Sequence, residues 1–191
     1  MRKLRIIAHI SLDGVIQHDA ADGFAHGDWT TPYRSPAGLA AVVEAQGAPF
    51  ELLLGRRTYD AWASYWPTAG DSAVAKGLNA ATKHVATHRP ESLDWGPVEH
   101  LGPDVLAGIH RLKATAGPDL IVWGSTTLTC VLLGEGLVDE VILLVYPVLL
   151  GQGKRFFSAE ADPRALALVS TQVTPTGVLL NRYRYLGALR T

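Results

Sequence analysis

Leu52-Leu53-Leu54-Gly55-Arg56-Arg57-Thr58-Tyr59 is an apolar, strand-like run that passes through one glycine into the start of a helix. A second stretch, Ile121-Val122-Trp123-Gly124-Ser125-Thr126-Thr127, has the same arrangement with hydroxyl side chains in place of arginines. Glycine lets the backbone approach a ligand closely, and the first turn of a helix has unpaired N–H groups. We therefore expect both segments to bind anions, and two such segments indicate a ligand with more than one phosphate.

Length and composition favour one globular domain spanning residues 1–191. The chain has a formal net charge of −1 and 48% hydrophobic residues, which argues against disorder and against a nucleic-acid partner. The solitary Cys130 cannot form an intramolecular disulfide, and we expect a buried, inert thiol. The apolar N-terminal stretch is too short for a signal peptide, and no run is long enough to span a membrane. A cytoplasmic protein without a membrane partner is expected.

Strand-like and helix-like segments alternate along most of the chain. We expect strands at residues 4–10, 50–54, 83–87, 120–123, 138–150, 167–173 and 178–186. Helices are expected at residues 37–46, 57–65, 71–79 and from the N-cap Asp104 to the pair Gly117-Pro118. This alternation predicts a largely parallel sheet covered by helices on both faces, and the two late strands predict an antiparallel C-terminal edge.

Basic side chains gather around the first of the two anion-binding segments. Arg56, Arg57 and Thr58 open one helix, and Thr87-His88-Arg89 ends the strand at residues 83–87. If that strand lies beside the strand at residues 50–54, Arg89 reaches the same face as Arg56, and the group would select a phosphorylated adenosine. The alternative is solvated surface arginines, and the hydroxyls after Gly124 are also consistent with a simple helix cap.

Four segments together carry a family resemblance: residues 10–16 (ISLDGVI), 55–59 (GRRTY), 123–125 (WGS) with Leu128, and 136–156, which includes GLVDE and PVLLGQGKRF. On these residues the chain resembles the dihydrofolate-reductase-like superfamily, in the bacterial branch related to the reductase domain of the bifunctional riboflavin-biosynthesis deaminase/reductase. The resemblance implies a three-layer α/β/α fold with an eight-stranded, mostly parallel sheet, and NADPH bound across the carboxyl ends of its strands.

The resemblance also assigns residues to the cofactor. Arg56 would lie beside the adenosine 2′-phosphate, Thr58 at the pyrophosphate, and Thr87, His88 and Arg89 around adenosine. Gly124 and Ser125 would lie under the cofactor, and the residues at 13–29 would form a lid. The remaining implied cofactor contacts are Ala8, His9 and Ile16 beside the nicotinamide, together with Gly55, Arg57, Thr126 and Leu128.

The residues expected to bind the substrate depart from the family pattern. Dihydrofolate reductases have a buried acid on the helix before the second strand, whereas the matching position here is Leu39 and the acid on that helix is Glu44. Asp13 and Asp28 are the remaining acidic candidates for catalysis, and both also fit structural roles in the loop. Trp29 and Tyr33 lie in the same loop, where core packing explains them less well, so we expect them to contact the substrate or the lid.

The hypothesis that follows is an NADPH-dependent reductase that transfers hydride to an imine-like or carbonyl carbon of a small heterocycle, with the proton supplied by water. The alternatives are a 5-amino-6-ribosylaminopyrimidinone reductase of riboflavin synthesis, a nucleotide-binding module without turnover, and a genuine dihydrofolate reductase. No metal is expected, because the histidines are scattered. We expect a homodimer, because residues 141–150 are more apolar than one sheet face requires, although a central strand explains them equally.

Overall fold

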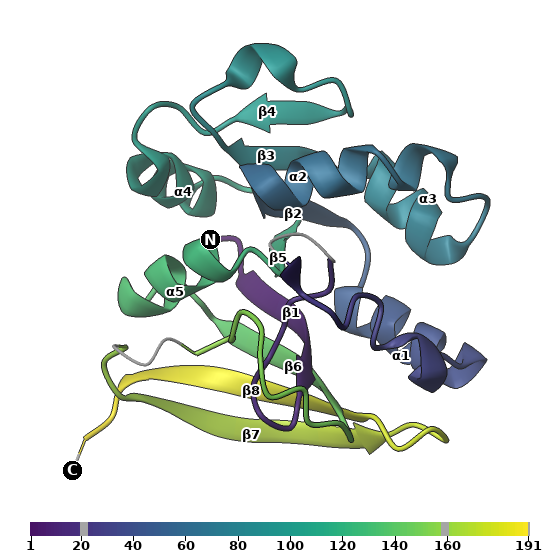
Figure 1. Ribbon diagram of the computed structural model, residues 1–191. Helices are drawn as coiled ribbons and strands as arrows, with labels where there is room; N and C mark the ends of the chain where they lie inside the picture. The colour runs from purple at the N-terminus through teal and green to yellow at the C-terminus, as the bar shows by residue number, and fades with distance from the viewer. Residues whose placement is uncertain (20–22, 158–160, 191) are drawn as a thin grey trace.

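An eight-stranded sheet forms the centre of the molecule, and the computed structural model describes residues 1–19, 23–157 and 161–190 (Figure 1). The strands are β1 Leu4–Ser11, β2 Phe50–Gly55, β3 Lys83–Ala86, β4 Val98–His100, β5 Asp119–Trp123, β6 Glu140–Tyr146, β7 Arg164–Val173 and β8 Leu179–Ala188. Their order is β4-β3-β2-β5-β1-β6-β8-β7. β8 runs antiparallel to both β6 and β7, and the other pairings are parallel, which confirms the predicted fold class.

Helices cover both faces of this sheet. They are α1 Pro36–Gln46, α2 Arg56–Ala63, α3 Ala73–Ala80, α4 Val105–Ala114 and α5 Thr126–Gly134, with short 3-10 helices η2 Thr31–Tyr33, η3 Trp66–Thr68 and η4 Pro90–Ser92. α1 and α3 lie on one side of the sheet, and α4 and α5 lie on the other (Figure 1). The arrangement has the three layers that the family resemblance implied.

The central strands are buried on both faces, and alternate residues enter two separate cores. In β5, Ile121 and Trp123 face the core beneath α1 and α3, whereas Leu120 and Val122 face the core beneath α4 and α5. A strand that is apolar on both faces is typical of a parallel sheet. Each fully buried Leu, Ile or Val contributes about 1.5–3 kcal/mol, so these strands hold the layers together.

Several observed elements differ from the predicted ones. The strand β4 was not predicted, because it has three residues and no apolar run, and it exists through its parallel pairing with β3. The apolar segment at residues 138–150 forms a strand only as far as Tyr146, because Pro147 follows it and has no N–H to donate. The helix that begins after Asp104 ends at Ala114, before Gly117 and Pro118.

The strand part of the predicted apolar segment, β6, lies between β1 and β8, and its alternate residues enter the two cores. Val141 and Ile142 are fully buried within one chain, so the central strand accounts for the first part of the apolar segment, whereas Leu149 beyond the strand is 73% exposed. Homodimerisation remains a prediction.

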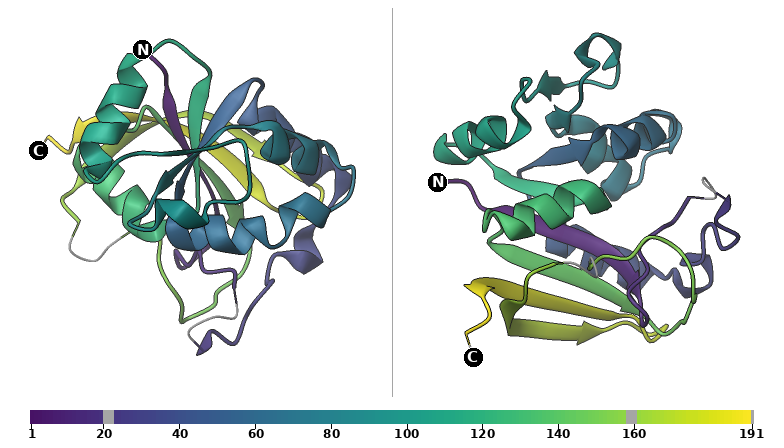
Figure 2. Two further views of the ribbon diagram at one scale, coloured as in Figure 1. Left: turned by 90° about the horizontal axis from the view of Figure 1, so that it is seen from above. Right: turned by 60° about the vertical axis from the view of Figure 1, so that its left-hand side comes forward.

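The loops after β1 and β6 lie side by side and project from one edge of the sheet (Figure 2). Leu12 N–H donates to the Val148 carbonyl at 2.9 Å, and Ile16 N–H donates to the Lys154 carbonyl at 2.9 Å. This is the edge at which the parallel strands end, and ligands of open α/β sheets bind at that edge.

Two helical glycines provide a direct test of the packing. A Cβ at Gly108 in α4 would lie 2.2 Å from the backbone oxygen of Leu101, whereas a Cβ at Gly77 in α3 would make ordinary contacts at 3.6 Å with the Phe50 ring. We predict that Gly108→Ala lowers the unfolding free energy by about 1–3 kcal/mol through overpacking. Gly77→Ala is the matched control and should raise it by about 0.5–1 kcal/mol. Urea unfolding followed by circular dichroism measures both, and a Gly108→Ala protein as stable as wild type contradicts the packing.

Candidate functional site

The two anion-binding segments lie next to each other at the carboxyl edge of the sheet. β2 and β5 pair in parallel, with Leu53 opposite Val122, so α2 and α5 begin side by side. Ser125 connects the two starts: its Oγ accepts a hydrogen bond from Gly55 N at 3.1 Å and donates one to Thr58 Oγ1 at 2.9 Å. The sequence-predicted residues Gly55, Thr58 and Ser125 are therefore in direct contact.

The starts of α2 and α5 differ from the other α-helix starts in their capping. Ser35, Ser72 and Asp104 each accept a hydrogen bond from a first-turn N–H of α1, α3 and α4, respectively. The N-cap residues of α2 and α5 are Gly55 and Ser125, and neither forms a side-chain capping bond. The N-cap side chains therefore do not occupy the first-turn N–H groups of these two helices, and the helix dipole favours an anion there.

Backbone conformation at the second segment supports a close approach. Gly124 and Ser125 have φ values of +56° and +50°, in the left-handed region. Such a conformation costs a non-glycine residue about 1–3 kcal/mol, and the hydrogen bonds of Ser125 to Gly55 and Thr58 hold it there. A Cβ at Gly55 would lie 3.3 Å from Ser125 Oγ, so any larger residue would press on the Ser125 hydroxyl.

Arg56 ties the start of α2 to the segment that follows β3. Its Nε donates to the Asp60 carboxylate at 2.8 Å, its Nη1 to the Arg89 carbonyl at 2.7 Å, and its Nη2 to Ser92 Oγ at 2.8 Å. β3 lies beside β2, which is the condition under which Arg89 was expected to reach Arg56, so the residues Thr87, His88 and Arg89 come next to Arg56. The Arg56 guanidinium therefore positions this segment in addition to carrying charge.

Exposed cations surround Arg56. The side chain of Arg56 is 18% exposed, whereas those of Arg57 and Arg89 are 53% and 66% exposed. Arg57 Nε lies 3.9 Å from Asp19 Oδ2, which joins the start of α2 to the loop after β1. Arg89 and Arg57 are thus the more accessible basic side chains for a phosphate, with His88 also exposed.

The residues expected beside the nicotinamide divide between the two faces of β1. Ala8 and Ile16 are buried in the core beneath α5 together with Leu128. Thr126 is the first residue of α5. His9 lies on the opposite face, where its ring stacks on Trp123 with a centroid separation of 5.5 Å. Trp123 directly precedes Gly124, so His9 lies next to the segment that contains Gly124 and Ser125.

A group of mutually contacting rings forms the other half of this edge, and we call it the His9–Tyr146 cluster. Its members are His9, His18, Trp29, Tyr33, Trp123 and Tyr146. His9 Nδ1 and the Tyr146 hydroxyl are 2.7 Å apart. The Trp29 and Tyr33 rings contact the Tyr146 ring edge-on, at 5.1 and 5.6 Å between centroids. The two aromatics expected to contact the substrate therefore meet at Tyr146.

Tyr146 was not among the site residues expected from the sequence. It ends β6, directly before Pro147, at the carboxyl edge where parallel strands present ligand-binding side chains. An aromatic residue at the end of a strand and before a proline was the signal that could have identified it.

The His9–Tyr146 cluster is electrically neutral at pH 7. Burial lowers the pKa of His9 to about 3, helped by the nearby His18 and Arg34, and burial lowers the pKa of His18 to about 4. Burial also raises the pKa of Tyr146 to about 12. Trp123 Nε1 and His18 Nε2 are buried with no hydrogen-bond partner among the described residues. Unpaired buried donors and acceptors are costly, so the cluster has polar capacity left for a ligand.

The acidic candidates do not enter this cluster as proton donors. Asp13 accepts hydrogen bonds from the Ser11 hydroxyl and from the N–H groups of Leu150 and Gly151, and the Ser11 bond is the largest cause that lowers its pKa to about 2. It is ionised at neutral pH and anchors the loop after β6. Asp28 is exposed and has φ +54°, a turn conformation in the loop before Trp29.

The position that matches the folate-reductase acid faces solvent. Leu39 is 48% exposed and Glu44 is also exposed, so α1 directs neither side chain into the cluster. Within the described ranges, no three His, Cys, Asp or Glu side chains are arranged to hold a metal ion. No described helix combines the length and apolar character needed to cross a bilayer.

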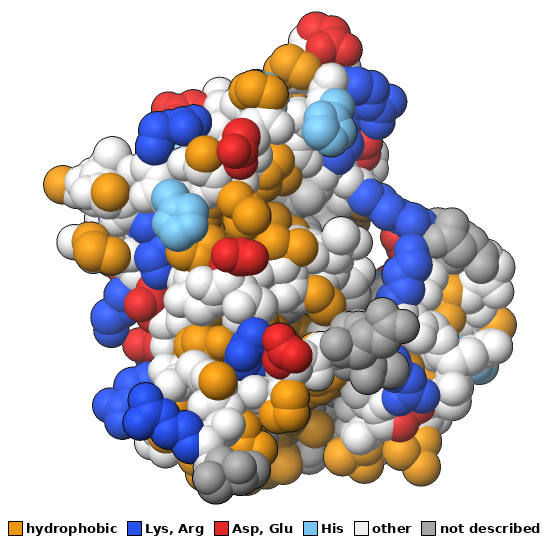
Figure 3. Space-filling model, turned by 90° about the vertical axis from the view of Figure 1, so that its left-hand side faces the viewer, with side chains coloured by type: hydrophobic (Ala, Val, Ile, Leu, Met, Phe, Trp, Pro, Cys, Tyr) orange, Lys and Arg blue, Asp and Glu red, His pale blue; other side chains and the backbone are white. Residues whose placement is uncertain are grey.

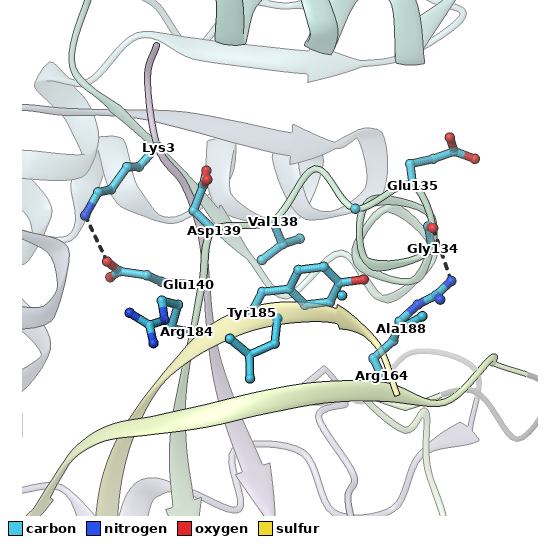
Figure 4. A pocket seen from close by; sticks show the side chains of 13 residues that line it. Lys3, Gly134, Glu135, Val138, Asp139, Glu140, Arg164, Arg184, Tyr185 and Ala188 are labelled. Carbon is cyan, nitrogen blue, oxygen red and sulfur yellow. Dashed lines mark hydrogen bonds and ion pairs between the residues drawn. The ribbon is translucent and has the colours of Figure 1, made fainter. Parts of the chain in front are cut away.

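A hollow of about 640 Å³ lies at the opposite edge of the sheet (Figure 4). Charged side chains of β6, β7 and β8 line it, together with Lys3, which precedes β1. Several of them already have partners: Lys3 Nζ donates to Glu140 Oε1 at 3.1 Å, and Arg164 donates to the Gly134 carbonyl at 3.2 Å. Because these charged side chains are already paired, the carboxyl edge is the better candidate site.

Figure 3 shows the face covered by α4 and α5, on which acidic and basic side chains are interspersed. Basic side chains also cross a separate hollow at the edge of this face.

Comparisons with known proteins agree with this fold. The chain is similar to the uncharacterized protein YyaP of Bacillus subtilis, at 29% identity over 140 residues, which are 71% of this chain and 74% of YyaP. Its fold is similar to a pyrimidine reductase-like protein from Corynebacterium diphtheriae, with a TM-score of 0.67, 16% identity and coverage of 97% and 92% of the two chains.

Two further solved structures share the fold. A dihydrofolate reductase from Enterococcus faecalis, complexed with NADP(H), has a TM-score of 0.62, 17% identity and coverage of 96% of each chain. A Thermotoga maritima diaminohydroxyphosphoribosylaminopyrimidine deaminase/5-amino-6-(5-phosphoribosylamino)uracil reductase has a TM-score of 0.66 and 15% identity, and the match covers 97% of this chain and 57% of that protein. The family model of the RibD C-terminal domain matches residues 2–180. The chain therefore belongs to the RibD C-terminal domain family.

Proposed function

We propose that this protein is an NADPH-dependent reductase that transfers hydride to the C=N or C=O carbon of a small, planar heterocycle. The observation that carries the proposal is the pair of uncapped helix starts joined through Ser125, beside three arginines. Membership of the RibD C-terminal domain family supports a reductase, and the NADP(H)-bound neighbour supports a nicotinamide cofactor at this edge.

The chemistry of the residues fits NADPH. The first-turn N–H groups of α2 and α5, which no N-cap side chain engages, would provide donors for a pyrophosphate together with the Thr58 and Ser125 hydroxyls. Arg89 and Arg57 extend exposed guanidiniums from the two segments that Arg56 joins, and guanidiniums pair well with a phosphomonoester such as the 2′-phosphate. Gly124 leaves open space above the backbone, since a Cβ there would meet no atom within 4 Å.

The bound cofactor would supply the hydride, and the protein would supply position and exclusion of water. Trp29 is 8% exposed and donates from Nε1 to the Gln17 carbonyl at 2.7 Å, which fastens the loop over the His9–Tyr146 cluster. The neutral, aromatic lining of this cluster suits an uncharged ring better than a protonated pterin, which requires a buried carboxylate. Classical folate reduction therefore has the weaker support.

We predict that selectivity for NADPH over NADH depends on the exposed arginines. A charge-assisted hydrogen bond contributes about 1.5–3 kcal/mol, so Arg89→Ala should weaken NADPH binding by about 10- to 100-fold and leave NADH binding unchanged. Arg56→Ala should weaken NADPH more than NADH as well, because it removes a charge and releases the segment at residues 87–92. Isothermal titration calorimetry measures both affinities.

The matched control is Arg184→Ala, which removes an exposed arginine at the opposite edge of the sheet (Figure 4). It should leave both affinities unchanged. Equal affinity of the wild-type protein for NADPH and NADH would contradict the assignment of a 2′-phosphate site.

Turnover is tested with 5-amino-6-(5-phosphoribosylamino)uracil, the substrate in the name of the Thermotoga maritima neighbour. An N-glycosylamine of this kind opens to an imine, whose carbon can accept hydride. We expect the decrease in NADPH absorbance at 340 nm to follow addition of this compound. Tight NADPH binding without turnover of it, or of related glycosylamines and carbonyl heterocycles, would instead indicate the nucleotide-binding module.

A further inference from the structure

We propose that the Tyr146 hydroxyl is the proton donor of this reductase, and that His9 positions it and resupplies its proton. The proposal rests on the proposed function, because a proton donor is needed only if hydride is transferred at this site. It assigns to two residues of adjacent strands the role that a carboxylate fills in dihydrofolate reductases.

Tyr146 lies where the two halves of the site meet. His9 is on β1, opposite Leu144, and Tyr146 follows at the end of the neighbouring strand β6. The His9 ring stacks on Trp123, which precedes the Gly124 and Ser125 segment of the cofactor half. The Tyr146 ring in turn contacts the rings of Trp29 and Tyr33, which belong to the loop that covers the site. A planar ring held between these halves would lie beside the Tyr146 hydroxyl.

The groups that face Tyr146 keep it protonated and hydrogen-bonded. The titratable and charged groups near it are His9 on β1, His18 and Asp28 in the loop after β1, and Tyr33 and Arg34 before α1. Burial keeps both imidazoles neutral and the phenol protonated across the neutral pH range. When the neutral His9 donates from Nδ1 to the Tyr146 oxygen, 2.7 Å away, the phenolic hydrogen is free to point at a substrate.

The described acids near this edge are less suited to the role. Asp13 is committed to Ser11, two backbone N–H groups and the Arg155 guanidinium, 3.8 Å away, and it is ionised. Asp28 is exposed and contributes its backbone N–H to the His18 carbonyl. Neither carboxylate forms a hydrogen bond with the rings of the cluster in the described part of the chain.

Reduction of a C=N substrate requires one hydride and one proton. The carbon gains hydride, the electron pair of the broken π bond moves to nitrogen, and a new N–H bond forms as the Tyr146 O–H bond breaks. The phenolate takes the proton from His9 Nδ1, while His9 Nε2 takes one proton from water. The imidazole is then neutral with its proton on Nε2, and proton exchange with solvent returns that proton to Nδ1 before the next turnover. The hydroxide left by the water is neutralised by solvent, so the net consumption is one hydride and one solvent proton.

The test compares Tyr146→Phe with Tyr185→Phe, using 5-amino-6-(5-phosphoribosylamino)uracil and NADPH. Phenylalanine keeps the ring contacts of Tyr146 and removes only the hydroxyl. Tyr185→Phe removes a hydroxyl that donates to the Leu133 carbonyl at the opposite edge, so it controls for the chemical change (Figure 4). General acid catalysis contributes about 10²- to 10⁴-fold, so we expect kcat to fall at least about 100-fold in Tyr146→Phe only. NADPH affinity should be unchanged.

The pH profile separates proton donation from a structural role. Wild-type kcat should be flat from pH 6 to 9, because the phenol is protonated throughout. In Tyr146→Phe the phenolic donor is missing and hydronium must supply the proton, so kcat should fall tenfold for each unit by which the pH rises. His9→Asn, which retains an N–H near the Nδ1 position, should retain more activity than His9→Ala.

A second readout requires no substrate. In ¹⁵N NMR spectra of the cofactor-free protein, His9 should remain neutral down to pH 5, and Tyr146→Phe should shift its Nδ1 resonance. A His9 that titrates near pH 6.5, or a Tyr146→Phe enzyme with wild-type kcat, overturns the proton-donor assignment and leaves the reductase intact. A wild-type protein that binds NADPH but reduces none of the acceptors overturns the reductase proposal, and the proton donor falls with it.

Discussion

The Ser125 side chain is the contact on which the whole carboxyl edge depends. Its hydrogen bonds to Gly55 N and Thr58 Oγ1 fix the starts of α2 and α5 against each other, across the pairing of β2 with β5. The left-handed backbone at Gly124 and Ser125 is tolerated because these bonds hold it. Two helix starts without side-chain caps then face the same space, and Arg56 brings the segment after β3 into that space as well.

The site has two halves with different electrostatics. The cofactor half combines helix N-termini with arginines, so it favours phosphates. The substrate half is a neutral cluster in which burial keeps His9 and His18 unprotonated. Leu39, the position expected to match the acid of folate reductases, is exposed, and the anionic Asp13 anchors a loop. A neutral lining can hold an uncharged heterocycle, and it requires a neutral acid such as a phenol for proton transfer.

Much of the fold could be predicted because the central strands are buried on both faces, and continuous apolar runs mark them. The order of the two glycine-containing segments also predicted that they meet, since the carboxyl ends of parallel strands share one edge. The strand β4 could not be predicted, because its pairing with β3 creates it. The role of Tyr146 was hidden for a related reason: its contacts with His9, Trp29 and Tyr33 join segments that are distant in sequence. The engagement of Arg56 by Asp60, Arg89 and Ser92 likewise depends on tertiary structure.

The central claim is that the two uncapped helix starts together bind the phosphates of NADPH. The most direct measurement is a ¹H–¹⁵N NMR titration of the protein with NADP⁺. The account predicts that the largest amide shifts occur in the first turns of α2 and α5, at Arg57, Thr58, Thr126 and Thr127. The first turns of α1, α3 and α4, which side chains already cap, should shift little. Shifts confined to other parts of the chain, or the absence of shifts at saturating NADP⁺, would contradict it.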